Sequence, residues 1–255
     1  MQMKQRIDVW LAAHGLAESR EKAQALIMAG QVYIGERKVL KASEQAEEDA
    51  PVTLRGEQTH FASRGGHKLE KAITAFQADV TGAVALDIGA AAGGFTDVLL
   101  RHGAAHVYAI DVGYGQLDWR LRNDARESFD RQPNLTVMDV SFISIKLILP
   151  VAAEIMGPGG RFLTLVKPQF EAGRGQVGKN GVVREKEIHA RVLREICQFA
   201  PSFGWHAAGL TFSPIKGPAG NIEFLADIRP GAGKEISDEE ILRLVEQAHR
   251  ELNHA

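Results

Sequence analysis

The chain is poor in cysteine. Only Cys197 occurs among 255 residues, so neither a disulfide framework nor a cysteine cluster for a metal is available. This cysteine lies in an apolar helical pattern, which is typical of a small core residue. The nine histidines show no ligand spacing such as H-E-x-x-H. We therefore expect no metal site.

Long apolar runs are also lacking. No stretch approaches the roughly 18 apolar residues that a membrane-spanning helix needs, and the N-terminus carries no apolar signal segment. The formal net charge is only -2, so the overall composition does not point to a nucleic-acid partner. We expect a soluble cytoplasmic protein without a membrane partner, with one large domain or two unequal ones.

Basic charge is nevertheless concentrated locally. Residues 161–194 hold eight Lys/Arg and three Glu, and residues 1–41 hold seven Lys/Arg and four Asp/Glu. Such segments can form a basic surface on a protein that is neutral overall. The alternative is that these charges only solvate helix faces.

Residues 1–60 are predicted to form a small α+β domain. Apolar residues recur at helical spacing around Trp10 until Gly15, and Ser19 can cap a second helix over Arg20–Met28. Short strands are expected at 32–34, 39 and 52–54, with the acidic residues 44–51 as a connection between strands.

One pattern in this domain is specific: R-I-D-x-W-L-x-x-x-G-L-x-x-S-R-x-x-A-x-x-L-I-x-x-G-x-V. It resembles the alpha-L RNA-binding domain first known in a ribosomal small-subunit protein, the S-four type. The resemblance implies that Arg6, Arg20 and Lys22 face RNA phosphates, contacts that position an RNA rather than select its sequence. The alternative is an N-terminal helical cap with exposed charges.

A small-residue turn organises the rest of the chain. An apolar strand from Val84 ends at Asp87-Ile88, glycines and alanines follow, and a helix begins near Gly94. Asp111, about 20 residues after the turn, ends the next strand, at the usual distance for gripping ribose hydroxyls. The turn suits S-adenosylmethionine (SAM) or a dinucleotide, although Ala91 replaces the second glycine of G-x-G-x-x-G. A turn without a ligand is the third reading.

The remaining pattern predicts an α/β fold with a Rossmann-like sheet and helices on both faces. We expect a linker at 61–65 and a catalytic domain at 66–255. Strands are predicted at 105–110, 135–138, 161–166, 207–212 and 222–228, and helices at 69–76, 118–126, 143–156, 184–203 and 238–253. The last two strands suit an antiparallel pair that closes such a sheet.

Charged residues follow two of these strands. Asp139 ends one and Lys167 ends the next, and ligands bind at the carboxyl ends of strands in open parallel sheets. The glycine-rich loop 172–182 carries Arg174 and Lys179 and is interpreted as a lid or nucleic-acid contact, or else as a disordered surface loop. We group these two residues with Arg64 as candidates for RNA contact.

The motifs in their order resemble the TlyA family, whose members also carry the name haemolysin. They are the N-terminal domain, Ser63–Lys68, Asp87–Phe95, Asp111–Leu117, Asp139–Ser144 and Lys167–Glu171. The family's catalytic domain is similar to FtsJ-type ribose 2'-O-methyltransferases. The resemblance implies methyl transfer from SAM to the 2'-hydroxyl of a cytidine in ribosomal RNA, with ribosomal RNA or ribosomal subunits as partners. The SAM-binding residues it implies are Asp87, Gly89, Ala90, Gly93, Gly94, Phe95 and Asp111.

The resemblance also implies a catalytic tetrad of Lys68, Asp139, Lys167 and Glu223. We expect Lys167 closest to the 2'-oxygen, as a base or as a cation that stabilises the developing alkoxide. Lys68 would favour proton loss from Lys167 through like-charge repulsion. The two carboxylates would orient both amines, and alignment of the reacting atoms would do most of the remaining work.

One segment departs from the family pattern. Residues 125–138 are short where the family has a further strand near the adenine, which leaves Asp124 as a weak candidate contact. Two alternatives to the enzyme remain: a non-catalytic RNA-binding protein on ribosomal particles with a degenerate cofactor site, or a haemolysin. We expect a monomer or weak dimer.

Overall fold

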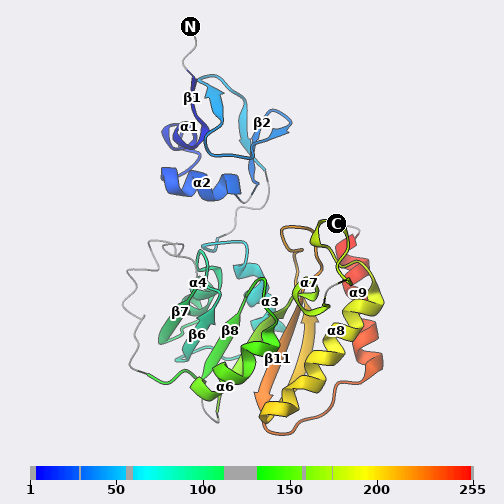
Figure 1. The fold of residues 1–255 in the computed structure, drawn as a ribbon. Coiled ribbons are helices and arrows are strands. Elements are labelled where there is room, and N and C mark those ends of the chain that lie inside the picture. Colours follow the sequence, from blue (N-terminus) through cyan, green and yellow to red (C-terminus); the bar gives the residue numbers. More distant parts are fainter. Residues whose placement is uncertain are drawn as a thin grey trace. The chain divides into compact units, whose positions relative to one another are not determined.

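The computed structural model describes residues 4–28, 30–55, 60–111, 131–156, 159–173 and 175–253 (Figure 1). The chain divides between Gln58 and Thr59 into two compact units. Each unit has a hydrophobic core of its own.

The first unit packs two helices against short strands. Its elements are β1 (Lys4–Arg6), α1 (Ile7–Ala13), α2 (Arg20–Met28), β2 (Val32–Ile34), β3 (Arg37–Lys38), β4 (Gln45–Glu47) and β5 (Val52–Leu54). The core between them is formed by fully buried apolar side chains such as Ile7, Leu11 and Val32. This arrangement confirms the predicted α+β class.

The acidic run at 44–51 was predicted wrongly as a connection only. Residues 45–47 form β4, which pairs antiparallel with β1. Ala46 is buried between two exposed neighbours and joins the core. Ala46 among the polar residues of this run is too weak a pattern to predict a strand, because the pairing partner lies about 40 residues away in sequence.

Asp8 anchors the two helices of this unit. Its side chain is fully buried, and it accepts hydrogen bonds from Arg6 (2.9 and 3.0 Å), Arg20 (2.9 Å) and Gln24 (2.8 Å). The Arg6 guanidinium, helped by Gln24 and Arg20, holds the pKa of this carboxyl well below its usual range. A buried carboxylate is tolerated here because each of its oxygens is satisfied.

The second unit is built on a six-stranded sheet in the order β10-β11-β9-β8-β6-β7. Strands β6 (Val84–Ile88), β7 (His106–Ile110), β8 (Leu135–Met138) and β9 (Arg161–Val166) are parallel. Strand β11 (Phe224–Pro230) runs antiparallel to β9, and β10 (Trp205–Phe212) runs antiparallel to β11. The predicted Rossmann-like fold class with a closing antiparallel pair is therefore confirmed.

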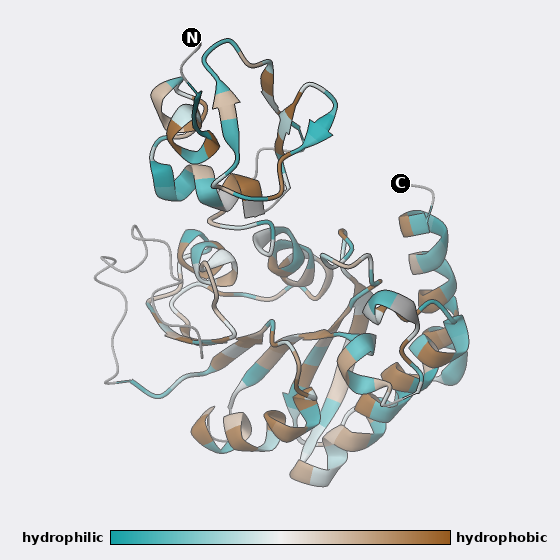
Figure 2. Cartoon of the chain, turned by 45° about the horizontal axis from the view of Figure 1, so that its top comes forward, coloured by the Kyte–Doolittle hydropathy of each residue, from teal (hydrophilic) through white to brown (hydrophobic). Residues whose placement is uncertain are grey.

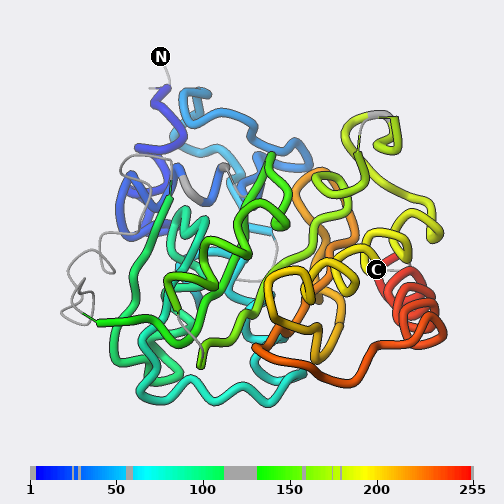
Figure 3. The backbone as a smooth tube through the Cα atoms, turned by 60° about the horizontal axis from the view of Figure 1, so that its bottom comes forward, coloured from blue at the N-terminus to red at the C-terminus, as the bar shows by residue number. Residues whose placement is uncertain are grey.

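Helices cover both faces of this sheet (Figure 1). Helices α3 (Gly66–Ala75) and α4 (Gly94–Arg101) bury one face, whereas α6 (Leu149–Met156), α8 (Lys186–Phe199) and α9 (Asp238–Asn253) bury the other. Figure 2 shows apolar residues along the strands and helices that are apolar on one side. In Figure 3, α8 (yellow) and α9 (red) lie side by side.

Prolines explain two helices that begin or end differently from the prediction. The segment predicted as one helix over 143–156 is a 3-10 turn, η1 (Ile145–Leu147), followed by α6, which has Pro150 in its first turn. Helix α8 likewise gives way to η3 (Ala200–Phe203), which contains Pro201. The predicted helix at 118–126 lies outside the described residues.

The glycine-rich loop is tied down at its end rather than free. It contains the short turn η2 (Lys179–Gly181), and Val182 and Val183 are buried. Buried Asn221 donates to the Gly181 carbonyl (2.9 Å) and accepts from the Val183 amide (3.0 Å). Across the residues that the structure describes, no helix is long and apolar enough to span a membrane.

We predict that Asp8→Asn loosens the first unit. The amide brings two donors into a site that already supplies several, which should cost about 1–3 kcal/mol of unfolding free energy. Folding lowers the pKa of Asp8, so ionised Asp8 stabilises the unit at any pH above the ordinary pKa of a carboxyl group. This contribution is lost as the pH falls below about 4. Amide hydrogen exchange over residues 4–55 measures the change. The exposed Glu18→Gln is the matched control, and unchanged protection in Asp8→Asn would contradict this account.

Candidate active site

The ends of four elements meet at one edge of the large sheet. Asp139 follows β8 and Lys167 follows β9, so both leave the carboxyl ends of neighbouring parallel strands. Because β11 is antiparallel, its beginning lies at this same edge, and Glu223 immediately precedes Phe224, the partner of Val166. Lys68 reaches the same place from the first turn of α3.

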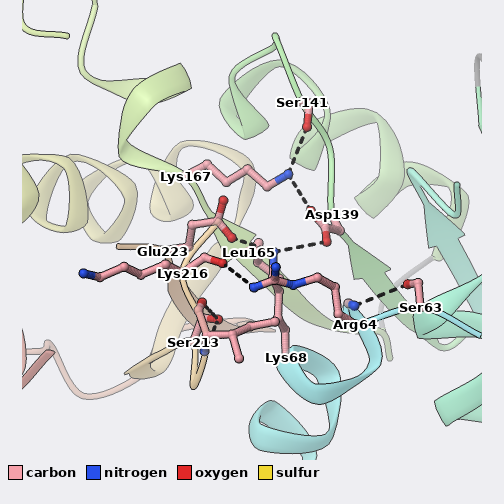
Figure 4. A network of polar contacts seen from close by, with 12 residues as sticks. Ser63, Arg64, Lys68, Asp139, Ser141, Leu165, Lys167, Ser213, Lys216 and Glu223 are labelled. Atoms are coloured by element: carbon pink, nitrogen blue, oxygen red, sulfur yellow. Dashed lines mark hydrogen bonds and ion pairs between the residues drawn. The ribbon is translucent and has the colours of Figure 1, made fainter. Parts of the chain in front are cut away.

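These four side chains form one chain of ion pairs (Figure 4). Lys68 Nζ lies 2.6 Å from Glu223 Oε2 and 3.6 Å from Asp139 Oδ2, and Lys167 Nζ lies 2.5 Å from Asp139 Oδ1. Glu223 is 1% exposed, and Lys68 and Lys167 are below 10%. Two cations and two anions cancel, which is the condition under which charges can be withdrawn from water. The four residues named by the family resemblance are thus brought together.

Other residues complete this network and were not predicted as site residues. Lys167 Nζ also donates to Ser141 Oγ at 3.0 Å, and Gln169 Nε2 donates to Glu223 Oε1 at 3.3 Å. A Cβ on Gly217 would lie 2.5 Å from that same Glu223 oxygen, so a larger residue there would displace the carboxylate. Ser141 stood two residues from Asp139 in the motif, but no spacing in the sequence pointed to Gln169 or Gly217.

The small-residue turn borders the ion pairs. Gly89 has φ +84°, and a Cβ on it would lie 2.7 Å from the Asp139 carbonyl oxygen, so the backbones approach as closely as glycine allows. Asp111 Oδ2 accepts a hydrogen bond from the Ala91 amide at 2.9 Å, which fixes the turn to the end of β7. Gly93, also at positive φ, precedes the start of α4.

A cavity of about 260 Å³ lies between the turn and the charged residues. Its lining combines small residues, aromatic surface and both lysines: Ser63, Arg64, Gly65, Lys68, Gly89, Ala90, Ala91, Gly94, Phe95, Asp139, Ser141, Lys167, Lys216 and Pro218. The predicted cofactor residues Gly89, Ala90, Gly94 and Phe95 therefore face one hollow together with Lys68, Asp139 and Lys167. This arrangement fits a small ligand that reaches the lysines.

Asp87 lies beneath the turn rather than in the lining. It is fully buried; Oδ2 accepts a hydrogen bond from Thr96 Oγ1 at 2.6 Å, and Oδ1 has no hydrogen-bond partner among the described residues. Burial raises the pKa of Asp87 to about 7, and the charges of Asp139 and Asp111 act in the same direction. Asp87 can therefore support the turn through its hydrogen bond with Thr96 without lining the cavity.

An aromatic pair flanks Lys167. Phe142 is 91% exposed and has φ +65°, an uncommon backbone conformation for a residue with a large side chain. Its ring centroid lies 5.1 Å from that of Phe170, and Lys167 Nζ lies 5.9 Å from the Phe170 ring. An exposed aromatic surface thus stands beside the lysine.

The predicted RNA-contact residues are found in different settings. Arg6 and Arg20 are partly exposed but pair with buried Asp8, and Lys22 is half-buried. Arg64 is exposed at the rim of the cavity and donates to the Lys216 carbonyl at 3.0 Å. Arg174, the side chain of Lys179 and the weak adenine candidate Asp124 lie outside the described residues.

A larger hollow of about 1020 Å³ lies elsewhere, between α8, β10 and residues 231–238. Its lining includes Cys197, whose thiol pKa is raised to about 11 by burial. A thiol that stays protonated is a poor nucleophile and metal ligand. The smaller cavity is therefore the better candidate for the active site, because reactive side chains line it, although the other hollow is larger.

Comparison with known proteins agrees with this geometry. Residues 61–228 match the model of the FtsJ-like methyltransferase family, and residues 5–52 match the S4 domain. The chain therefore belongs to the FtsJ-like methyltransferase family and carries an S4 domain.

Individual proteins of similar sequence indicate the family more narrowly. YqxC of Bacillus subtilis, named as a candidate rRNA methyltransferase, is 46% identical over 98% of this chain and 95% of its own. The Mycobacterium tuberculosis protein named 16S/23S rRNA (cytidine-2'-O)-methyltransferase TlyA is 40% identical over 93% and 94%. A solved structure of a protein from Streptococcus thermophilus that bears the name hemolysin is 42% identical, with a TM-score of 0.78 over 100% of this chain and 98% of that chain. The predicted TlyA family is confirmed.

We predict that Asp87→Asn changes the pH dependence of stability. Folding raises the carboxyl's pKa, so the folded state binds more protons than the unfolded state between about pH 4 and pH 7. The wild-type unfolding free energy should therefore fall across this range relative to the variant, by at most about 3 kcal/mol between pH 5 and pH 8. Denaturant titration of the second unit at several pH values measures the difference. Parallel pH profiles for the two proteins would refute a raised pKa at this position.

Proposed function

We propose that the protein transfers a methyl group from SAM to the 2'-hydroxyl of a cytidine in ribosomal RNA. The observation that carries this proposal is the largely buried chain of ion pairs Glu223–Lys68–Asp139–Lys167, which lies beside the small-residue turn. The names of the TlyA relatives support the substrate, and the match to the S4 domain supports RNA as the partner. Such a protein would act in the cytoplasm on ribosomal RNA or ribosomal subunits.

The turn is suited to hold SAM. One wall of the cavity is formed by the close backbone at Gly89, by the segment Ala90–Phe95 and by the N-terminus of α4, and this wall leaves room for a ligand. Asp111 lies at the end of the neighbouring strand. Asp87 and Gly93 would support this segment rather than touch the ligand. When bound, SAM supplies a methyl group activated by a positively charged sulfur.

The lysines would perform the proton chemistry. A ribose hydroxyl is a poor nucleophile, so its proton must leave as its oxygen gains the methyl group. Lys167 is the cation of an ion pair in the resting site, so it must first lose a proton to solvent; its Nζ would then accept the hydroxyl proton, and Asp139 at 2.5 Å would stabilise the ammonium that is restored. Lys68, held by Glu223, supplies a second positive charge near the oxygen without adding net charge to the site.

Both units would contribute to RNA binding. In the first unit we assign Arg6, Arg20 and Lys22 to phosphate contacts, with the exposed faces of the two arginines available beyond their bonds to Asp8. In the second we assign Arg64, Arg174 and Lys179. The exposed Phe142 ring beside Lys167 offers a stacking surface of the kind that single-stranded RNA bases use. We further propose domain limits of 1–60 and 66–255 with a linker at 61–65.

We predict that Lys167→Ala abolishes methyl transfer while leaving the fold and SAM affinity intact. Loss of a positioned base typically costs about 10²–10⁴-fold in rate, and the turn that would hold SAM does not depend on this side chain. Calorimetric titration with SAM, with NAD as the negative control, measures affinity. A radiolabelled methyl assay on ribosomal subunits measures transfer.

The matched control is Lys186→Ala, which breaks an exposed pair with Glu246 away from the cavity. It should leave both measurements unchanged. No SAM binding by the folded wild type would reject the proposed function, and full activity in Lys167→Ala would reject the assigned base.

A further inference from the structure

The segment between Asp139 and Ile145 needs something to hold it. It leaves β8 at the active edge, places Ser141 against Lys167 and then turns through Phe142, whose φ is +65°. For a residue with a large side chain this conformation is unfavourable and persists only when neighbouring structure enforces it. Phe142 itself is 91% exposed, so burial of its ring cannot supply the restraint.

Glu171 supplies that restraint. Its Oε2 accepts a hydrogen bond from Ser144 Oγ at 2.6 Å, and its Oε1 accepts one from the Ile145 amide at 2.8 Å. The carboxylate is only 8% exposed, yet no lysine or arginine of the described chain forms an ion pair with it. Its charge is therefore balanced by hydrogen bonds to this segment, and bonds to an ionised group are about twice as strong as neutral ones.

The two Glu171 hydrogen bonds act as a clamp, and its other end is the segment that carries Lys167. Glu171 closes α7 (Pro168–Glu171), a single turn that starts directly after Lys167 and has Pro168 at its first position. Proline fixes the backbone at that position. Lys167 and Glu171 thus belong to one short, stiff piece, and Glu171 ties Ser144 and Ile145 to it.

The clamp and the cofactor turn are separate. Asp139 is held independently, because its amide donates to the Ile88 carbonyl at 3.1 Å. None of the Glu171 contacts involves residues 89–95. Loss of the clamp should release Ser141 and Phe142 from Lys167, while the turn at 89–95 that would hold SAM keeps its own contacts.

We propose that Glu171 is a positioning residue for methyl transfer: it holds the Ser141–Phe142 turn against Lys167, and so acts on the rate of transfer rather than on SAM binding. This inference rests on the proposed function. The clamp holds Ser141 within hydrogen-bond distance of Lys167 Nζ, so that Ser141 and Asp139 together orient this amine. It also keeps the Phe142 ring against the Phe170 ring. A misplacement of about 1 Å in such a site can cost about 10²-fold in rate.

The test compares three variants with the wild type. Glu171→Ala removes both acceptors, whereas Glu171→Gln can still accept from the Ile145 amide and donate to Ser144 Oγ. Asp227→Ala is the control, since it removes another buried carboxylate, which lies on β11 and pairs with Arg161 on β9 and Arg229 on β11. Single-turnover methyl transfer, the calorimetric SAM dissociation constant and amide exchange at residues 139–147 are measured for each.

We expect Glu171→Ala to lower the single-turnover rate about 10²-fold, with SAM affinity within twofold of wild type and faster exchange at residues 139–147. Glu171→Gln should recover most of the rate, and Asp227→Ala should keep it under conditions in which it is folded. An undiminished rate in Glu171→Ala overturns the proposal, as does a parallel loss of SAM affinity, which would indicate a general structural role.

Two further outcomes keep the inference testable. If Glu171→Ala fails to fold, Ser144→Ala removes the hydroxyl that donates to Glu171, together with the cap that this oxygen makes to the Lys146 amide. It should give a smaller rate loss with the same unchanged SAM affinity; an undiminished rate there overturns the proposal. If the wild type transfers no methyl group at all, the proposed function fails, whereas amide exchange still decides whether Glu171 holds this segment.

Discussion

Four charges at one edge of the sheet, three of them buried, impose the main constraint on the second unit. A buried lysine or carboxylate is costly unless it is paired and hydrogen-bonded, and the chain Glu223–Lys68–Asp139–Lys167 meets this condition only if four elements end at the same place. Lys68 lies next to both carboxylates, so the three ion pairs form one connected network. The geometry of the sheet is therefore tied to the chemistry of its edge.

The sheet meets the constraint through one reversed strand. Parallel strands β8 and β9 bring Asp139 and Lys167 to their carboxyl ends, but a third parallel strand would have brought only its last residue there. Because β11 runs the other way, its first residues arrive instead, and Glu223 enters the site from the chain just before Phe224. Gly217 leaves the space that the Glu223 carboxylate occupies. The small-residue turn at 89–95 and the ion pairs then share one cavity.

Local patterns in the sequence predict much of the fold. Strands 84–88, 106–110, 135–138 and 161–166 are short apolar runs with clear ends, and the capping box of the last helix is present, with Glu240 accepting from the Ser237 amide at 2.8 Å. The rule that ligands bind at strand ends singled out Asp139 and Lys167 without any structure. Lys68 and Glu223 came from the family resemblance, because no local pattern reveals the register that joins β11 to β9.

What the sequence could not reveal depends on contacts between distant residues. Strand β4 exists because it pairs with β1, and Asp8 is a buried anchor because Arg20 and Gln24 reach it from the next helix. Glu171 read as one more acidic residue in a motif, although it bonds across 26 and 27 positions. Such roles are set by packing, which single-residue propensities do not encode.

The most direct test of the account is the chemical position of the transferred methyl group. Ribosomal subunits would be incubated with the protein and methyl-labelled SAM, and the RNA then digested with alkali. Methylation of a 2'-oxygen removes the hydroxyl that alkaline cleavage requires, so the label should appear in alkali-resistant dinucleotides with cytidine at the modified position. Label in single nucleotides would place the methyl group on a base and contradict the role given to Lys167 and its ion pairs, and absence of label would contradict the assignment as a ribose methyltransferase.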